Sequence, residues 1–334
     1  MTARTTSRRQ LLTSAAGVVA AARFPAPALA QPRPKIRLGH LHVLAVDGHI
    51  LTGLDRGSFE RHGVEFERTV FDTGPEVFDA MAAGKLDLLS AGGVISSYLA
   101  LGQGRLFLIN DIEIATAQLW VRPDLGVRSF ADLKGKRIAT TRRTTAHIFL
   151  DRALRANHLS PSDVEIVSLR MSDSVTAFIA GDVPAIALWV PFNVAVRDSV
   201  PGAVKLVDAA AFYPQSAVLG GWVARSDYYE QNRDILTGVI RGWAEANDYM
   251  VRNAAATADA LQRNHYGRAP LSDIVEQLKA QKMFTSREWK RLYTDGSVVR
   301  WLQQASDFFM SEARISDATP ASEYFDPSLY LSVI

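Results

Sequence analysis

The sequence predicts an α/β protein of two lobes, each a mainly parallel sheet flanked by helices, with a helical C-terminal extension on the first lobe. Strand-like apolar runs alternate with segments of helical spacing, which is typical of parallel sheets. A chain of 334 residues also exceeds the length at which a single core stops growing, so two lobes are expected. From Asn232 onward the pattern is wholly helical.

Residues 1–30 are predicted to be a twin-arginine export signal. The segment Ser7-Arg8-Arg9-Gln10-Leu11-Leu12 opens a weakly apolar run, and Ala28-Leu29-Ala30 forms a small-x-small cleavage site. The run is far shorter than the roughly 20 apolar residues that a membrane span needs. We therefore expect cleavage after Ala30 and a periplasmic protein.

The composition excludes several classes of function. The leader holds four arginines and no acidic residue, so the rest of the chain has 33 basic and 35 acidic residues and a charge of −2. Such a balance does not indicate a nucleic-acid partner. Because the chain has no cysteine, disulfides, thiolate catalysis and Cys-ligated metals are excluded.

The first lobe alternates strands with helices. Strands are expected at 36–39, 64–70 and 86–90, and helices are expected around Ile50, Leu54 and Phe59 and at 77–83 and 94–101. Gly92 and Gly93 open the last of these helices.

The second lobe repeats a sequence pattern of the first. Its strands are expected at 137–140, 164–169 and 185–189, and its helices at 145–157 and 172–180. The segment 81–88 recurs in outline as 178–185, a helix ended by Ala-Gly and followed by a buried strand. In both places glycine is the residue that can adopt the left-handed conformation of an abrupt helix end.

The C-terminal part is predicted to pack back on the first lobe. Its longest helix carries an apolar stripe, and Thr285 with Glu288 forms a capping box for a later helix. The chain must then cross between the lobes near 118–121 and near 220–223. Lobe 1 is accordingly expected to comprise 31–119 plus 223–334, and lobe 2 to comprise 120–222.

Four segments carry a family resemblance. They are the run Asp132 to Ala139, the helix opening Thr144 to His147, the turn Leu159 to Val164, and the stretch from Ala180-Gly181 to Pro191. With the leader and the two crossings, they make the chain similar to solute-binding proteins of bacterial ABC transporters. The resemblance is to the family that binds nitrate, alkanesulfonates, taurine and thiamine pyrimidine precursors. It implies the type II periplasmic binding fold, a monomer, a permease partner, and neither cofactor nor metal.

Two departures from the family pattern concern the ligand. Where the family has Gly-x-Val-Asp-Ala, this chain has Gly181-Asp182-Val183-Pro184-Ala185. Where many members have a polar residue such as glutamine after the first strand, this chain has His40-Leu41-His42. We expect both changes to bear on which ligand is bound, and neither to affect the fold.

The ligand is expected outside the carboxyl ends of the strands. The loops 40–43, 91–94, 141–145 and 190–192 meet there. Thr144 and Thr145 open a helix, where a hydroxyl either caps the helix or donates to a bound oxyanion beside backbone N–H groups. Gly92 and Gly93 either let the backbone approach a ligand or form a simple turn.

Histidines and arginines give further candidates. His40 and His42 alternate along an extended segment, and His42 is expected to bond an organic ligand; a metal site would need a third ligand such as Asp47 or His49. His147 either reaches the same pocket or packs on its helix. Arg142 and Arg143 either supply charge to an anion or remain solvated.

Four aromatic residues lie nearest the expected cleft in chain order: Trp189, Phe192, Tyr213 and Trp222. Each alone is more often a core residue. As a group they favour an organic anion over bare nitrate, because aromatic walls bury an apolar body.

The sequence therefore predicts a receptor that closes its lobes around a small organic anion, such as a sulfonate or carboxylate. An enzyme is the main alternative, but no nucleophile elbow, zinc-protease motif or phosphate-binding loop is present. A sensor subunit of the same fold and a binder of a neutral pyrimidine remain open.

Overall fold

The computed structural model describes Met1, Thr2 and residues 35–334. The predicted export signal and its cleavage site after Ala30 lie, apart from the first two residues, outside the described residues. No helix in the described part of the chain is long and apolar enough to cross a membrane.

In the described residues, ten strands form two five-stranded sheets of the same design. The first has the order β2-β1-β3-β10-β4 and the second β7-β6-β8-β5-β9. The strands of the first sheet are β1 (Ile36–Leu41), β2 (Phe66–Phe71), β3 (Leu88–Ala91), β4 (Arg105–Ile112) and β10 (Leu219–Ala224). Those of the second are β5 (Ala117–Val121), β6 (Arg137–Thr140), β7 (Glu165–Ser168), β8 (Ala185–Trp189) and β9 (Val204–Asp208).

The predicted two-sheet α/β architecture is confirmed, but each sheet is mixed rather than mainly parallel in its pairing. The strand that enters from the other sheet runs antiparallel to both neighbours: β10 beside β3 and β4, and β5 beside β8 and β9. The remaining pairs are parallel. β5 and β10 run in the reverse direction because each enters its sheet directly after a crossing, at the edge where the other strands end.

The crossings lie a few residues earlier than expected. The chain passes between the sheets at 113–116 and 213–218, because β5 and β10 pair with their new sheets along their whole lengths. The sequence patterns did not predict β4 and β9, and they placed the crossings where the structure has β5 and β10. The division of the whole chain into two lobes stays a prediction.

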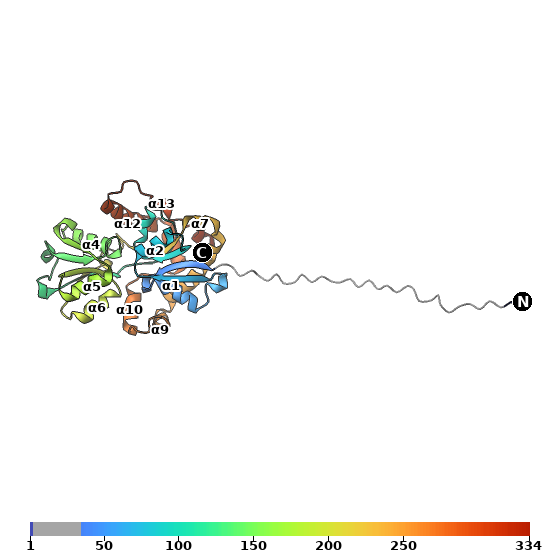
Figure 1. Ribbon diagram of the computed structural model, residues 1–334, viewed down its shortest axis with the longest axis horizontal. Helices are drawn as coiled ribbons and strands as arrows, with labels where there is room; N and C mark the ends of the chain where they lie inside the picture. The colour runs from blue at the N-terminus through green and yellow to red at the C-terminus, as the bar shows by residue number, and fades with distance from the viewer. Residues whose placement is uncertain (3–34) are drawn as a thin grey trace. The chain divides into compact units, whose positions relative to one another are not determined.

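Helices cover both sheets (Figure 1). Those from the first two-thirds of the chain are α1 (Leu44–Asp55), α2 (Gly74–Ala82), α3 (Ile95–Leu99), α4 (Thr145–Ala156), α5 (Met171–Ala180) and α6 (Phe192–Ser199). The C-terminal ones are α7 (Ser226–Gln231), α8 (Arg233–Arg252), α9 (Ala254–Asn264), α10 (Leu271–Lys279), α11 (Ser286–Thr294), α12 (Ser297–Ala313), α13 (Ala321–Tyr324) and α14 (Ser328–Val333). The capping box of Thr285 and Glu288 at the start of α11 is confirmed.

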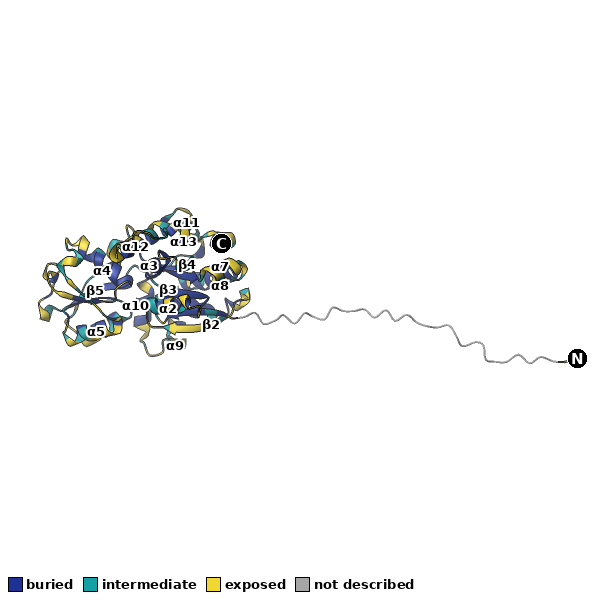
Figure 2. Ribbon diagram, turned by 45° about the horizontal axis from the view of Figure 1, so that its top comes forward, coloured by how far each residue is buried: buried dark blue, intermediate teal, exposed yellow. Residues whose placement is uncertain are grey.

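The C-terminal helices pack mainly on the first sheet, as expected. Figure 2 shows the inner strands buried, the edge strand β2 largely exposed, and the outer faces of the helices exposed. Trp243 and Trp289 are fully buried in the same apolar cluster as β1, β3 and β4. Two of these helices also touch the second sheet's helices: Arg197 of α6 pairs with Asp273 of α10 at 3.4 Å, and Ile148 of α4 shares a buried cluster with Phe309 of α12.

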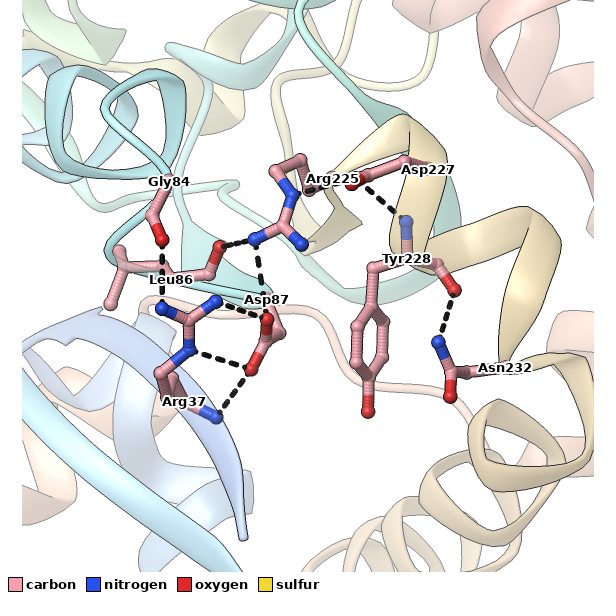
Figure 3. Close-up of polar contacts among 8 residues, drawn as sticks. All are labelled: Arg37, Gly84, Leu86, Asp87, Arg225, Asp227, Tyr228 and Asn232. Atoms are coloured by element: carbon pink, nitrogen blue, oxygen red, sulfur yellow. Dashed lines mark hydrogen bonds and ion pairs between the residues drawn. The ribbon is translucent and has the colours of Figure 1, made fainter. Parts of the chain in front are cut away.

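Asp87 joins three segments at the amino end of the first sheet (Figure 3). Its carboxylate accepts from the backbone and guanidinium of Arg37 at 2.6–3.0 Å and from Arg225 at 3.2 Å. Burial opposes ionisation, yet the hydrogen bonds and charge of these arginines hold the pKa of Asp87 below its usual value. Asp87 therefore links the start of β1 to the end of β10, at the edge of the sheet opposite the carboxyl ends of β1 and β3.

The second sheet shows the same turn with Pro184 in the place of Asp87. The Arg225 amide donates to the Asp87 carbonyl, and the Arg122 amide donates to the Pro184 carbonyl, both within 3.0 Å. Gly84 and Gly181 each have a positive φ, as the two Ala-Gly turns predict. Pro184 precedes β8 and the cleft follows β8, so Pro184 does not line the cleft. Its bearing on the ligand stays a prediction.

Candidate functional site

A cleft of two chambers lies between the sheets at the carboxyl ends of β1, β3, β6 and β8. The inner chamber has a volume of about 50 Å³ and the outer about 300 Å³; Leu41, Val43 and Trp189 line both. The inner chamber is also lined by Ala45, Val46, Gly74, Gly92, Val94, Glu113, Thr116, Thr144, Thr145 and Val190. Both sheets and the first crossing thus contribute to one cavity, the arrangement of a ligand cleft.

Glu113 is the polar centre of the inner chamber. Its Oε1 accepts from the Gly93 amide at 2.9 Å and from the Thr145 hydroxyl at 3.4 Å, and its Oε2 accepts from the Thr116 hydroxyl at 2.9 Å. Its own amide donates to the Val218 carbonyl of the second crossing at 2.9 Å. Glu113 therefore lies where the two crossings run side by side, and it engages donors from both sheets.

A second buried carboxyl, Asp111, lies behind Glu113 on β4. Both of its oxygens are buried without a hydrogen-bond partner among the described residues. Burial, and then the charge of Glu113, raise the pKa of Asp111 well above its usual value. Burial also raises the pKa of Glu113, against the opposing effect of its three donors. Because only Glu113 has donors for a charged form, we assign the proton to Asp111 and the charge to Glu113.

The Asp111 carboxyl predicts a pH-dependent stability. With its native pKa raised, Asp111 binds its proton more firmly in the folded than in the unfolded state, so its contribution to stability falls as pH rises above about 4. Asp111→Asn does not titrate. Its free energy of unfolding relative to wild type should therefore rise by on the order of 1–3 kcal/mol between pH 4 and pH 8. Urea unfolding followed by circular dichroism at both pH values measures this change.

Asp317→Asn, at an exposed position, is the control. A difference in unfolding free energy between Asp111→Asn and wild type that stays the same at both pH values would contradict the assignment of the proton to Asp111.

The outer chamber is bordered by polar groups from both sheets. The His42 Nδ1 bonds the buried Asp47 carboxylate at 2.6 Å, and its ring stacks on Tyr266 at 4.4 Å. The hydrogen bond to Asp47 raises the pKa of His42, whose side chain is 46% exposed. Across the chamber, Arg170 pairs with Asp72 at 3.0 Å and with Glu76 at 2.9 Å.

Six of the predicted residues line the two chambers. Gly92, Thr144, Thr145 and Trp189 line the inner one, and His42 and Phe192, with Trp189, line the outer one. Gly93 adjoins the inner chamber through its amide, which donates to Glu113. The structure thus brings together residues from the four predicted loops; their role in binding stays a prediction.

The histidines other than His42 face away from the chambers. His40 is 1% exposed within β1, and burial lowers its pKa. His147 accepts from the Arg143 amide and lies edge-on to Phe308, and burial lowers its pKa to about 4. Both residues lie outside the chamber linings because β1 and α4 turn these side chains toward packed elements. Within residues 35–334 no three His, Asp or Glu side chains are placed to hold a metal ion.

The two arginines and two of the aromatic residues also lie elsewhere. Arg142 faces Glu312 at 3.6 Å, and Arg143 bonds Ser97 and lies over the Tyr98 ring. Tyr213 lines a separate small cavity behind the second crossing. Trp222 is fully buried in the first sheet, where its Nε1 donates to Asn110 at 2.7 Å. Neither Tyr213 nor Trp222 lines the chambers: Trp222 faces the core side of β10, and Tyr213 lies on the second crossing beside the separate cavity, so proximity in chain order did not decide their place.

Sequence reasoning missed Glu113, Thr116 and Asp111. A usable signal was present, because Asp111 and Glu113 alternate with isoleucines directly after the apolar run Leu106–Ile109. Two acids at that spacing point to the same face of a strand. Because burying a carboxyl group in an apolar strand is costly, their presence there indicates a functional position.

Comparisons with known proteins agree with this geometry. The family model described as NMT1/THI5 like matches residues 48–256. A protein of Brucella abortus (strain 2308) named as a binding protein is 26% identical over 302 residues, covering 90% of this chain and 93% of the relative. An Escherichia coli (strain K12) protein named for binding aliphatic sulfonates is 26% identical over 241 residues, covering 72% of each chain. The taurine-binding periplasmic protein of the same strain is 27% identical over 188 residues, covering 55% of this chain and 57% of the relative.

Solved structures share the fold. The alkanesulfonate-binding protein of Xanthomonas axonopodis pv. citri, bound to MOPS, superposes with a TM-score of 0.71 at 20% identity, covering 89% of this chain and 99% of the other. The periplasmic nitrate-binding protein of Synechocystis PCC 6803 gives a TM-score of 0.66 at 11% identity, with coverages of 90% and 88%. At such identities the likeness establishes the fold alone.

The prediction of a binding protein rather than an enzyme is confirmed by the family match and by these relatives. The chain belongs to the NMT1/THI5-like family of binding proteins and has the type II periplasmic binding fold.

Proposed function

We propose that the protein is the solute-binding component of an ABC importer, which captures a small organic solute in the periplasm and presents it to a membrane permease. The observation that carries this proposal is the two-chambered cleft between two sheets joined by two adjacent crossings. Two crossings side by side form a hinge, so rotation of one sheet against the other opens and closes the chambers.

The contacts around the chambers are suited to reversible closure. Arg170 reaches Asp72 and Glu76 on one side, while Arg197 and Asn193 reach Glu276 of α10 on the other at 3.5 and 3.1 Å. Exposed ion pairs of this kind contribute about 0–1 kcal/mol each. A closed form held by such pairs opens at little cost, and a bound solute shifts the equilibrium toward closure.

We propose that the solute carries a sulfonate or carboxylate head in the outer chamber. Support comes from the relatives named for sulfonates and taurine and from the aromatic walls of Trp189 and Phe192. His42 supplies a donor there, and its raised pKa favours the cationic form. At the helix opening, where the sequence placed the anion, the Thr145 hydroxyl donates to Glu113 and the Thr144 hydroxyl to the Thr141 carbonyl, so a solute there would be held by the backbone amides of the first turn of α4, which no side chain caps.

Thermal unfolding against a panel of sulfonates, carboxylates, nitrate, bicarbonate and pyrimidines tests the proposal. A solute at about 100 times its dissociation constant should stabilise the protein by about 2.7 kcal/mol. Mass spectrometry of material that co-purifies with the protein identifies candidates outside the panel. No shift with any solute, together with turnover of one of them, would reject the receptor.

A further inference from the structure

We infer that the protein has a second ligand site, in a cavity beside the second crossing, where Arg152 binds the carboxylate of a small anion with an apolar body. This site is separate from the cleft between the sheets. The inference therefore goes beyond the proposed function and does not depend on which solute the cleft takes.

An open cavity of about 690 Å³, here called the Arg152 cavity, lies between α4, α12 and the second crossing with the short turn 209–212 before it. Its volume is within the range of about 300–1,000 Å³ that is usual for small-molecule sites. None of its lining residues lines either chamber of the cleft. Arg152 lies about two turns along α4 from Thr145, which lines the inner chamber. The Arg152 cavity is therefore a separate place in the fold.

Arg152 has a half-buried guanidinium without a partner. Within residues 35–334 it forms no hydrogen bond or ion pair, and it lies over no aromatic ring. Its neighbour Asp151 accepts with both carboxylate oxygens from the Arg155 Nε, each at 2.9 Å. Side chains four residues apart on a helix face one another, whereas adjacent ones do not, so Asp151 pairs with Arg155. The N–H donors of Arg152 are left for a group from outside the chain.

This guanidinium is costly to bury alone. Burial lowers the pKa of Arg152 to about 10, which still leaves the side chain charged at neutral pH. A charge withdrawn from water without a counter-charge destabilises the folded protein. An anion in the cavity would supply that counter-charge.

The lining has an excess of positive charge. Two arginines, Arg152 and Arg155, line the cavity against one acid, Asp151, which is already paired. Glu312 of α12 lies outside the lining and faces Arg142 at 3.6 Å. An anion beside Arg152 therefore meets an unpaired cation and no unpaired acid of the lining.

A second polar group at the cavity also lacks a partner. Ser216, like Arg152 and Phe212, lines both the Arg152 cavity and the small cavity that Tyr213 lines. The Ser216 Oγ is buried with no hydrogen-bond partner in the described part of the chain. Because buried hydroxyls are generally hydrogen-bonded, an unpartnered one near an unpaired guanidinium indicates a polar atom supplied from outside the chain.

The apolar part of the lining indicates what the anion carries. Phe212, at the end of the turn before the crossing, and Phe308 of α12 are both half-buried. The planar guanidinium of Arg152 matches the two oxygens of a carboxylate. Aromatic walls cover an apolar body. The favoured ligand is therefore a small aromatic or aliphatic carboxylate rather than an inorganic ion.

Fluorine NMR titration of the wild-type chain tests the inference with a matched pair of probes, 4-fluorophenylacetate and its neutral amide, 4-fluorophenylacetamide. We expect the acid to bind at least about tenfold more tightly than the amide, because the amide cannot form the charge-assisted pair with Arg152. Equal binding of the two probes, or no binding of the acid below about 10 mM, would overturn the inference.

The variant Arg152→Met locates the effect. It removes the charge and keeps an unbranched apolar side chain, so the preference for the acid should fall to within about twofold. Because an unpaired buried charge is costly, this variant should also resist urea at least as well as wild type. Arg252→Met, which alters an exposed arginine of α8 paired with Asp248 at 3.2 Å, is the matched control and should keep the full preference. A preference retained by Arg152→Met, or a clear loss of its stability, would overturn the assignment of Arg152.

Trp189→Ala separates the two sites, because a carboxylate probe can also enter the cleft. Trp189 does not line the Arg152 cavity, so this variant should keep the preference for the acid. Loss of the preference in Trp189→Ala together with its retention in Arg152→Met would place the probe in the cleft and overturn the inference.

The outcomes separate the inference from the proposed function. If no solute of the wider panel binds but the acid probe binds through Arg152, the receptor fails and the inference stands. If a panel solute binds and the two probes bind equally, the inference fails and the receptor stands.

Discussion

Replacing Trp189 by alanine is expected to weaken solute binding about 30- to 150-fold while leaving the protein folded. The indole lines both chambers and meets Phe192 edge-on at 5.7 Å, so it forms the wall along which a solute passes from one chamber to the other. Losing an aromatic anchor at such a position typically costs about 2–3 kcal/mol of binding free energy. Calorimetric titration with the tightest-binding solute of the panel measures the loss.

Trp120→Ala is the matched control for this variant. Trp120 lies in the second sheet, is also half-buried, and lines neither chamber; its Nε1 donates to Gln118 at 2.8 Å. We expect it to lower stability without changing affinity. Unchanged affinity in Trp189→Ala, or an equal loss in Trp120→Ala, would place the site elsewhere.

Replacing Trp222 by alanine is expected to lower the free energy of unfolding by about 3–5 kcal/mol. Its ring packs against Phe59 and Phe66, at centroid distances of 6.2 and 5.9 Å, and is fully buried. The variant would leave a cavity at the centre of the first sheet and remove a donor from Asn110. Urea unfolding followed by far-ultraviolet circular dichroism measures the change.

Trp222→Phe separates packing from hydrogen bonding at this position. It keeps an aromatic ring, and Asn110 retains the donor of Trp243 at 3.1 Å, so the loss should be clearly smaller than for alanine. Solute affinity of the folded fraction should equal that of wild type in both variants. A Trp222→Ala protein as stable as Trp189→Ala would show that the core has been assigned to the wrong tryptophan.

Trp189 and Trp222 show which features of a site can be predicted from sequence. Both lie in apolar segments, and both were expected at the cleft. Trp189 is the last residue of β8 and faces the chambers, whereas Trp222 lies within β10 and faces Asn110 and the core. The alternation of side chains along a strand is visible in sequence, but the face that meets the cleft depends on the neighbouring strands.

Elements that depend on residues close together in the sequence were predicted correctly. The strands at 137–140 and 185–189 have the predicted bounds, and the capping box at Thr285 and the left-handed Gly84 and Gly181 are as expected. Each depends on residues close in sequence: apolar runs, a reciprocal side-chain cap, or a glycine able to take a positive φ.

By itself the sequence determined the alternating α/β architecture, the repeated Ala-Gly turn and the loops that meet at the cleft, because strand direction brings carboxyl ends to one edge. Only the tertiary structure decided the reversed strands and the chemistry of the inner chamber. Strand exchange places Glu113 beside Val218, more than a hundred residues away in sequence. That pairing brings a buried carboxylate onto the donors at Gly93 and Thr145, and long-range contacts of this kind leave no local pattern in a sequence.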